Sequence, residues 1–107
     1  MYYTYMLRCK DNSIYTGMTN DLSKRFNEHL FKTKNGAKYT KSHSAMKIEA
    51  AWKSKDKSLA CKLEYQIKNL SKVQKEKLIA GEKLSCFFSG KIDCRRYRIC
   101  NLNEIKK

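Results

Sequence analysis

This sequence of 107 residues contains no proline and only 10 acidic side chains. No apolar run approaches the ~20 residues that a membrane-spanning helix needs. The first residues show neither the basic nor the apolar segment of a secretory signal, so we expect no export and a cytoplasmic location. There is no internal repeat, low-complexity tract or linker, and the length suits one small domain.

Closely spaced cysteines are also missing, although the sequence contains five cysteines. An odd number of cysteines argues for free thiols in a reducing compartment. No two of them form a C-x-x-C pair, and the last three, Cys86, Cys94 and Cys100, have no histidine nearby. The spacing therefore argues against a zinc site.

The shortage of acidic residues leaves a large positive charge, because 24 Lys and Arg side chains give a net charge of +14. Of these 24 basic residues, 17 lie in residues 1–80 and 7 in residues 81–107, so the excess is not confined to a tail. A surface of this sign attracts polyanions, and nucleic acid is the commonest of them. A soluble Lys-rich surface without such a partner is the alternative.

The order of apolar residues predicts an α+β domain. Residues 2–8 are rich in aromatic and β-forming side chains and predict a strand, and residues 14–18 predict the returning strand after a turn at 11–13. Leu22, Phe26 and Leu30 recur every four residues. This period predicts a helix that begins at residues 19–21 and ends near residue 31, followed by a basic loop over 32–45.

A third strand and two more helices follow in the prediction. Residues 46–52 alternate apolar and polar side chains, as in a half-buried strand. Residues 56–58 should begin a second helix, and Ser71 a third over 72–80 that Gly81 ends. Residues 1–81 thus have the order β-β-α-β-α-α, a three-stranded antiparallel-type sheet flanked by helices. Residues 82–107 form an extension, in which 86–88 and 96–100 are short strands, an aromatic-bearing segment, or both.

Side chains suited to chemistry are concentrated near the start. Tyr5 and Tyr15 lie on the first two predicted strands, while Arg25 and His29 lie four residues apart on one face of the first helix. Glu64 lies at the border of the apolar face of the second helix, as Arg25 does on the first. Taken singly, His29 could be a core histidine, and Arg25 and Glu64 could be solvated surface residues. In combination, we expect them to meet over one face of the sheet.

These residue types suit hydrolysis of a phosphodiester. An arginine fork can bind and neutralise the scissile phosphate, and a carboxylate can hold Mg²⁺ or Mn²⁺. A phenol is a poor base unless cations lower its pKa, and we expect this basic site to do so. Gly17 would let a phosphate or another backbone approach closely.

The sequence resembles the GIY-YIG nuclease superfamily, and most closely its small, single-domain bacterial members. The resemblance covers roughly residues 2–80, and the first motif departs from it because Tyr3 stands where the family has glycine. The matching motifs are Tyr-Thr-Tyr at 3–5, Leu-Arg-Cys at 7–9, Tyr-Thr-Gly-Met-Thr-Asn-Asp-Leu at 15–22, Lys-Arg-Phe-Asn-Glu-His at 24–29, Gly-Ala-Lys-Tyr-Thr at 36–40 and Glu-Tyr-Gln-Ile-Lys-Asn-Leu-Ser-Lys at 64–72.

The resemblance implies a metal-dependent DNA endonuclease that is structure-selective or weakly sequence-specific, with a role in DNA repair or recombination. By similarity, Tyr5 and Tyr15 are the paired tyrosines, one of which activates water, and Arg25 contacts the phosphate. His29 assists proton transfer or orients a tyrosine, and Glu64 holds one divalent cation, Mg²⁺ or Mn²⁺. Which tyrosine is the base stays open, as does a covalent phosphotyrosine route.

The expected nucleic-acid contacts are mostly basic, with one aromatic side chain and one glycine among them. The lysines of the loop suit phosphate contacts, and its tyrosine suits stacking on an unpaired base, although a solvated loop is the alternative. The full set is Arg8, Gly17, Lys24, Lys32, Lys34, Lys38, Tyr39, Lys41 and Lys68.

Two functions remain in different classes. The first is an active DNA nuclease, which the complete set of five catalytic residues favours. The second is a catalytically weak or inactive nucleic-acid-binding module with the same fold. A partner-binding accessory role would rest on residues 82–107 alone. A protein partner for targeting and the oligomeric state are both left open by the sequence.

Overall fold

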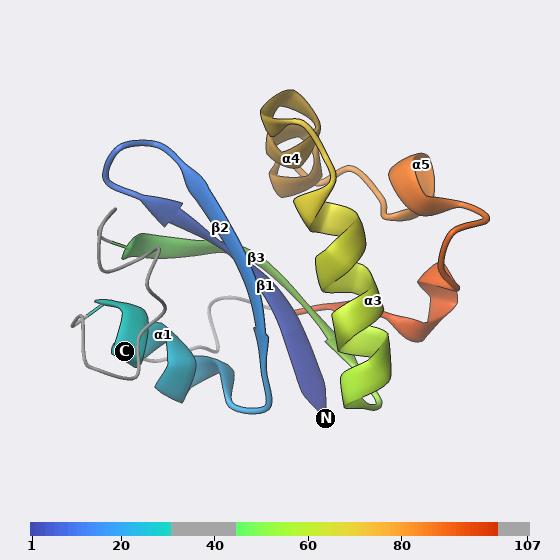
Figure 1. Cartoon of the computed structure of the whole chain (residues 1–107), viewed down its shortest axis with the longest axis horizontal. Coiled ribbons are helices and arrows are strands. Elements are labelled where there is room, and N and C mark those ends of the chain that lie inside the picture. Colours follow the sequence, from blue (N-terminus) through green and yellow to red (C-terminus); the bar gives the residue numbers. More distant parts are fainter. Residues whose placement is uncertain (31–44, 101–107) are drawn as a thin grey trace.

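An antiparallel hairpin begins the chain in the computed structural model, which describes residues 1–30 and 45–100 (Figure 1). Strand β1 (Tyr2–Cys9) pairs with β2 (Ile14–Thr19) as predicted. In the turn between them, Asp11 Oδ1 accepts a hydrogen bond from the backbone N–H of Ser13 at 3.0 Å. Asn12 takes the left-handed conformation there, with φ 70°, which asparagine tolerates better than most residues.

The sheet has four strands rather than the predicted three, in the order β2-β1-β3-β4. Strand β3 (Ala45–Ser54) pairs with the other edge of β1, and β4 (Arg98–Ile99) pairs antiparallel with the end of β3. The α+β class is confirmed. The fourth strand lies within residues 96–100, for which the sequence left a short strand and an aromatic-bearing segment open, because two residues are too few to show a period of two.

The helices begin where the capping residues predict. Helix α1 (Leu22–Leu30) follows Asp21, whose Oδ1 accepts from the backbone N–H of Lys24 at 3.1 Å. Helix α3 (Lys57–Lys68) is capped by Asp56. Helix α4 (Lys72–Ile79) begins with a capping box formed by Ser71 and Gln74.

Residues 82–99 pack on the same core as the rest of the chain. They contain α5 (Ser85–Phe88), the short helix η1 (Cys94–Arg96) and β4, so the strand considered for residues 86–88 is in fact helical. Leu84, Phe88 and Tyr97 are buried in the core cluster that contains residues of α3 and α4. The predicted basic loop at 32–45 lies, except for its last residue, outside the described residues.

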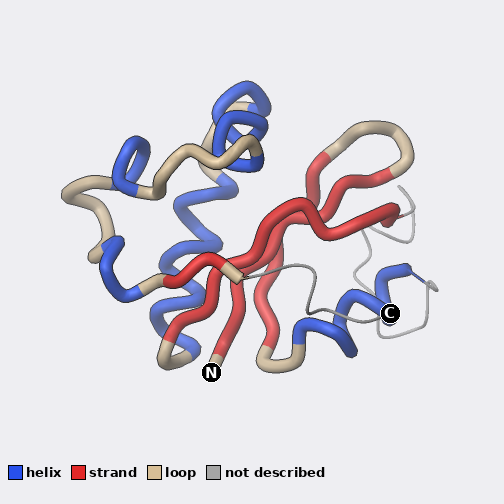
Figure 2. Tube along the Cα trace, turned by 180° about the vertical axis from the view of Figure 1, so that it is seen from behind, coloured by secondary structure: helices blue, strands red, loops and turns tan. Residues whose placement is uncertain are grey.

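Alternation along the strands gives the sheet two covered faces. On one face, Tyr5 and Leu7 pack against Leu22 and Phe26 of α1. On the other, Met6 and its neighbours pack against α3 and α4. Figures 1 and 2 show α1 on one side of the sheet and α3 with α4 on the other. The two halves of the predicted site therefore start on opposite sides of the sheet.

No helix in the described part of the chain is long and apolar enough to cross a membrane.

Candidate active site at the edge of the sheet

Two phenol rings meet on the α1 side of the hairpin. Tyr5 lies opposite Gly17, and Tyr15 lies opposite Leu7, so the two tyrosines are diagonal neighbours across the strand pair. Their ring centroids are 6.3 Å apart, and the ring planes are tilted by 49°. Tyr5 is only 1% exposed, whereas Tyr15 is partly exposed. The hairpin thus places one phenol inside the protein and one at its surface.

Gly17 is the residue that makes room for these rings. A Cβ atom at this position would lie 2.6 Å from Tyr5 Oη, 2.9 Å from Tyr5 Cζ and 3.0 Å from Tyr15 Cε2. Its backbone is ordinary strand, so the requirement for glycine comes from space and not from conformation. The group that lies closest to Gly17 is therefore the phenol of Tyr5. The sequence had suggested a substrate phosphate or another backbone segment in that place.

Arg25 ties the two phenols together. Hydrogen bonding and charge from its guanidinium both lower the pKa of Tyr5 and of Tyr15. It also forms an ion pair with Glu28, in which Nη1 lies 3.1 Å from Oε1. The Arg25 side chain is 25% exposed, so part of the guanidinium still faces solvent. The arginine can therefore hold both phenols and still meet a phosphate.

Glu28 is a site residue that sequence reasoning missed. It lies three residues after Arg25 on α1, a spacing at which side chains of opposite charge meet on a helix. That spacing was a visible signal. The pairing keeps the guanidinium oriented toward the sheet.

The phenols do not have the lowered pKa that the basic composition predicted. Burial is the largest effect on each and raises the pKa of Tyr5 and of Tyr15. The neighbouring Tyr15 raises the pKa of Tyr5 further, while Arg25 lowers the pKa of both by less than burial raises it. The prediction was wrong because one local cation does not offset the loss of water around a phenol. The net charge of the chain says little about this site.

Glu64 reaches the site from the other side of the sheet. It lies on α3, and its side chain is 24% exposed, with Lys68 Nζ 3.7 Å away. One turn earlier on α3, the thiol of Cys61 lies 3.3 Å from Met18 Sδ on the edge strand β2. The charge of Glu64 acts on both phenols, and it raises the pKa of Tyr5 and of Tyr15. The expected meeting over one face is therefore corrected to a meeting around the edge of the sheet.

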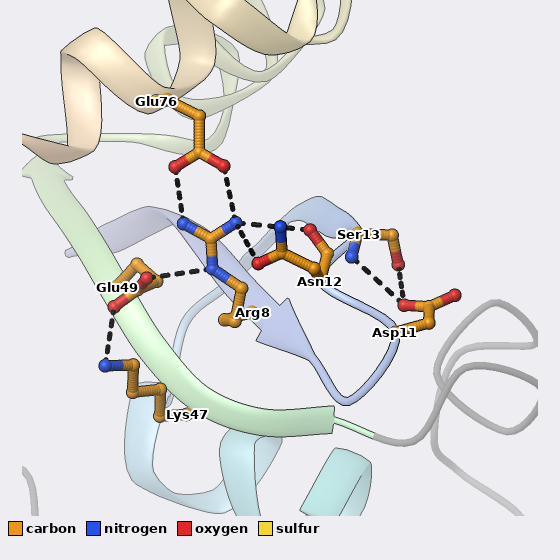
Figure 3. Close-up of polar contacts among 7 residues, drawn as sticks. All are labelled: Arg8, Asp11, Asn12, Ser13, Lys47, Glu49 and Glu76. Atoms are coloured by element: carbon orange, nitrogen blue, oxygen red, sulfur yellow. Dashed lines mark hydrogen bonds and ion pairs between the residues drawn. The ribbon is translucent and has the colours of Figure 1, made fainter.

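Arg8 does not face nucleic acid, contrary to the prediction. It is 8% exposed, and its guanidinium donates to both carboxylate oxygens of Glu76, at 2.6 Å for Nη1 to Oε2. Its Nε donates to Glu49 at 3.0 Å, and Nη1 also reaches the carbonyl and the side chain of Asn12. Figure 3 shows how this network joins α4 to β3 and to the hairpin turn. Arg8 is a structural residue.

The remaining predicted residues divide into exposed and undescribed ones. Lys24 and Lys68 are exposed, on α1 and α3 respectively. His29 lies on α1, and its side chain is outside the description, so its role stays a prediction. The loop residues also lie outside the described part: Lys32, Lys34, Lys38, Tyr39 and Lys41.

The donor set fits a divalent cation that is shared with a substrate. The described residues contain no group of three His, Cys, Asp or Glu side chains that could enclose a metal ion. Mg²⁺ commonly keeps several waters and takes one or two protein carboxylates together with phosphate oxygens. A single, partly exposed Glu64, whose charge acts on both phenols, has that composition. It does not have the composition of a closed structural metal site.

The fold and the paired phenols together are those of a small nuclease-type α+β domain. Residues 1–77 match the family model described as the GIY-YIG catalytic domain. The chain therefore belongs to the GIY-YIG family. Residues 78–107 lie beyond that match.

Small bacterial proteins of the UPF0213 group are similar to this chain. One from Fusobacterium nucleatum is 52% identical over 79 residues, which cover 74% of this chain and 77% of that protein. One from Enterobacter sp. is 41% identical over 81 residues, or 76% of this chain and 78% of that protein. The solution NMR structure of a UPF0213 protein from Bacillus halodurans is 40% identical and covers 75% of this chain and 84% of that one, with a TM-score of 0.48. The predicted resemblance to small single-domain members of the family is confirmed.

Proposed function

We propose that this chain is a metal-dependent DNA endonuclease that is structure-selective or weakly sequence-specific and serves DNA repair or recombination. The observation that supports the proposal is the convergence of Tyr5, Tyr15 and Arg25 at one edge of the sheet, where the charge of Glu64 also acts. A guanidinium between two phenols beside a carboxylate is poorly suited to packing alone, because each polar group loses water on burial.

Arg25 is proposed to bind the scissile phosphate. Its guanidinium is paired with Glu28 and interacts with Tyr5, so the fork is oriented before substrate arrives. N–H groups that already point to where negative charge develops in the transition state stabilise that charge. They lower the barrier to cleavage because the side chain does not have to rearrange during the reaction.

Tyr15 is proposed to take the proton from the attacking water. Of the two phenols, Tyr15 is the one that is partly exposed, whereas Tyr5 is 1% exposed and fills the space that a Cβ atom of residue 17 would need. A buried phenol cannot meet a water molecule from solvent, so Tyr5 is assigned to holding Arg25. The fold itself thus suggests which tyrosine is the base.

Glu64 would hold the Mg²⁺ or Mn²⁺ ion, with water and phosphate oxygens as the other ligands. When bound, the cation supplies positive charge against the phosphate and the departing oxygen. The carboxylate of Glu64 would supply the negative charge that attracts the cation, and Lys68 Nζ lies 3.7 Å from it. Lys68 and Lys24 are exposed and would contact phosphates, which give affinity without sequence choice.

The test is a cleavage panel of single-stranded, duplex and branched DNA with Mg²⁺ or Mn²⁺. We expect Glu64→Gln to lower the rate by about 10²-fold or more, since it removes the carboxylate charge and keeps the shape. The matched control is Glu82→Gln, an exposed carboxylate beyond α4. Cleavage that survives Glu64→Gln would exclude Glu64 as the metal residue.

A second candidate is a nucleic-acid-binding module with the same fold and little turnover. The raised pKa of both phenols favours it, because phenolate is scarce at neutral pH. DNA binding without cleavage by any metal in the panel would support this candidate over the first.

A further inference from the structure

Residues beyond the family match build a basic groove against α3. The groove has a volume of about 440 Å³. Helix α3 supplies one wall, and the segment that passes it on the way to β4, orange to red in Figure 1, supplies the other. The lining contains three cations and one carboxylate: Lys62, Lys91, Arg96 and Asp93.

The carboxylate in this groove does not neutralise its lysines. Asp93 is shared between two arginines, with Arg95 Nε at 3.1 Å and Arg96 Nε at 3.5 Å. Within the described part of the chain, Lys62 and Lys91 have no ion-pair partner. The groove therefore keeps a positive charge that favours an anionic ligand.

The frame of the groove is packed and not a loose tail. Tyr97 is 8% exposed, and its Oη donates a hydrogen bond to the carbonyl of Leu59 on α3 at 2.6 Å. Phe88, on the segment that leads into the groove, is 1% exposed. Because the backbone around the lysines is already ordered, a ligand would bind with little further loss of chain entropy.

A strip of exposed side chains connects this groove with Glu64. At about 100° per residue, Lys68, Tyr65 and Lys62 lie about 40°, 100° and 160° around the helix from Glu64. All three are exposed, and Tyr65 is 65% exposed. An aromatic ring between basic side chains can stack on an unpaired base while its neighbours meet phosphates. We call Lys68, Tyr65, Lys62, Lys91 and Arg96 the α3 strip.

We propose that the α3 strip binds a single-stranded arm of DNA that leaves the active site beside the scissile bond. The proposal rests on the proposed nuclease function and adds a substrate class to it, namely DNA with an unpaired arm. Tyr65 would stack on a base of the arm, and Lys62, Lys91 and Arg96 would contact its phosphates. An acidic protein on the same surface is the competing ligand that the experiment has to separate.

The experiment measures DNA affinity by fluorescence anisotropy in protein carrying Glu64→Gln. Two probes are used, a blunt duplex and the same duplex with a single-stranded arm. We expect Lys62→Gln with Lys91→Gln to weaken the armed probe by about tenfold or more and to reduce the slope of log K against log salt by about 1.4. We expect Tyr65→Ala to weaken the armed probe by about fivefold or more and the blunt duplex little.

The matched control removes two other exposed lysines, with Lys10→Gln and Lys77→Gln in one protein. It carries the same change in net charge away from the strip, and we expect it to weaken the armed probe by less than about threefold. Thermal unfolding should be unchanged in both variants, because all four lysines are exposed.

Three results would overturn the proposal. An equal loss in the strip and control variants would mean that only net charge acts. An equal loss for the armed and blunt probes would mean that the arm is not the ligand. Unchanged DNA affinity, with lost affinity for polyglutamate, would identify an acidic protein as the ligand. In each of these cases, cleavage of DNA by the wild type would still support the proposed nuclease function. If the wild type neither binds nor cleaves DNA, both proposals are wrong.

Discussion

Gly17→Ala is the sharpest test of the site geometry. The added Cβ would lie 2.6 Å from Tyr5 Oη, and ordinary contacts begin at 3.4 Å, so the phenol has to move by about 0.8 Å. The backbone at residue 17 is ordinary strand, which alanine adopts without strain. The substitution therefore changes the space between the rings and little else.

Two terms set the expected loss of stability. Overpacking a filled site costs about 1–3 kcal/mol, while replacing glycine by alanine in a strand returns about 0.5–1 kcal/mol. We expect the free energy of unfolding to fall by about 1–2 kcal/mol. If the chain is a nuclease, displaced phenols also misplace Arg25, and a shift of this size lowers the cleavage rate by about 10²-fold.

The measurement is urea unfolding followed by the fluorescence of Trp52. This residue is the only tryptophan and is 4% exposed in the core on the α3 side, so its signal reports global unfolding. The same substitution is made in a Tyr5→Phe background, which removes the atom 2.6 Å away. There we expect Gly17→Ala to cost about 1 kcal/mol less.

Gly81→Ala is the control for glycine replacement as such. Gly81 ends α4 with φ +111°, and a Cβ atom added there would have no neighbour within 4 Å among the described residues. It should destabilise through backbone strain, equally in both backgrounds, and leave cleavage unchanged. An identical cost of Gly17→Ala with and without the Tyr5 hydroxyl would refute the steric reasoning.

Three further predictions concern other contacts. Glu76→Ala should lower the free energy of unfolding by about 1–3 kcal/mol, because it removes the bidentate partner of the buried Arg8. Arg8 lowers the pKa of Glu76 from its ordinary value of 4.5. The difference in unfolding free energy between wild type and Glu76→Ala should therefore be complete above pH 4.5 and shrink as acid protonates the carboxylate. An equal difference at pH 7 and pH 2.5 would contradict this reasoning. Tyr97→Phe should cost about 1 kcal/mol in urea unfolding, since it removes the hydrogen bond from Tyr97 Oη to the carbonyl of Leu59, and an unchanged midpoint would contradict this. If Tyr15 is the base, its raised pKa predicts a cleavage rate that rises about tenfold per pH unit from pH 7 to 9, and a flat profile would exclude a phenolate.

Local patterns were enough to predict most of the fold. The period of four along α1, the alternation along β3 and the caps at Asp56 and Ser71 each depend on residues within one or two turns. Such features are readable because neighbouring residues alone determine them. For the two-residue β4, the sequence offered a strand within residues 96–100 only as one alternative, because this strand exists only through pairing with β3, more than 40 residues earlier.

The site was predicted as a set of residue types, and its geometry was not. Arg8 shows the limit: its partners Glu49 and Glu76 are 41 and 68 residues away, so its burial could not be read from its neighbours. The lowered phenol pKa failed for a related reason, since burial at the site outweighs the charge of the whole chain. Both errors came from treating a basic composition as a local property.

The sequence by itself determined which chemical groups the domain carries and on which helices and strands they lie. Only the tertiary structure decided that Gly17 makes room for Tyr5, that Tyr15 is the more exposed phenol, and that Glu64 acts from around the sheet edge. The reason is that a local period tells which face of an element is buried. It does not tell which distant side chain shares that space, because this depends on how the helices pack across the sheet.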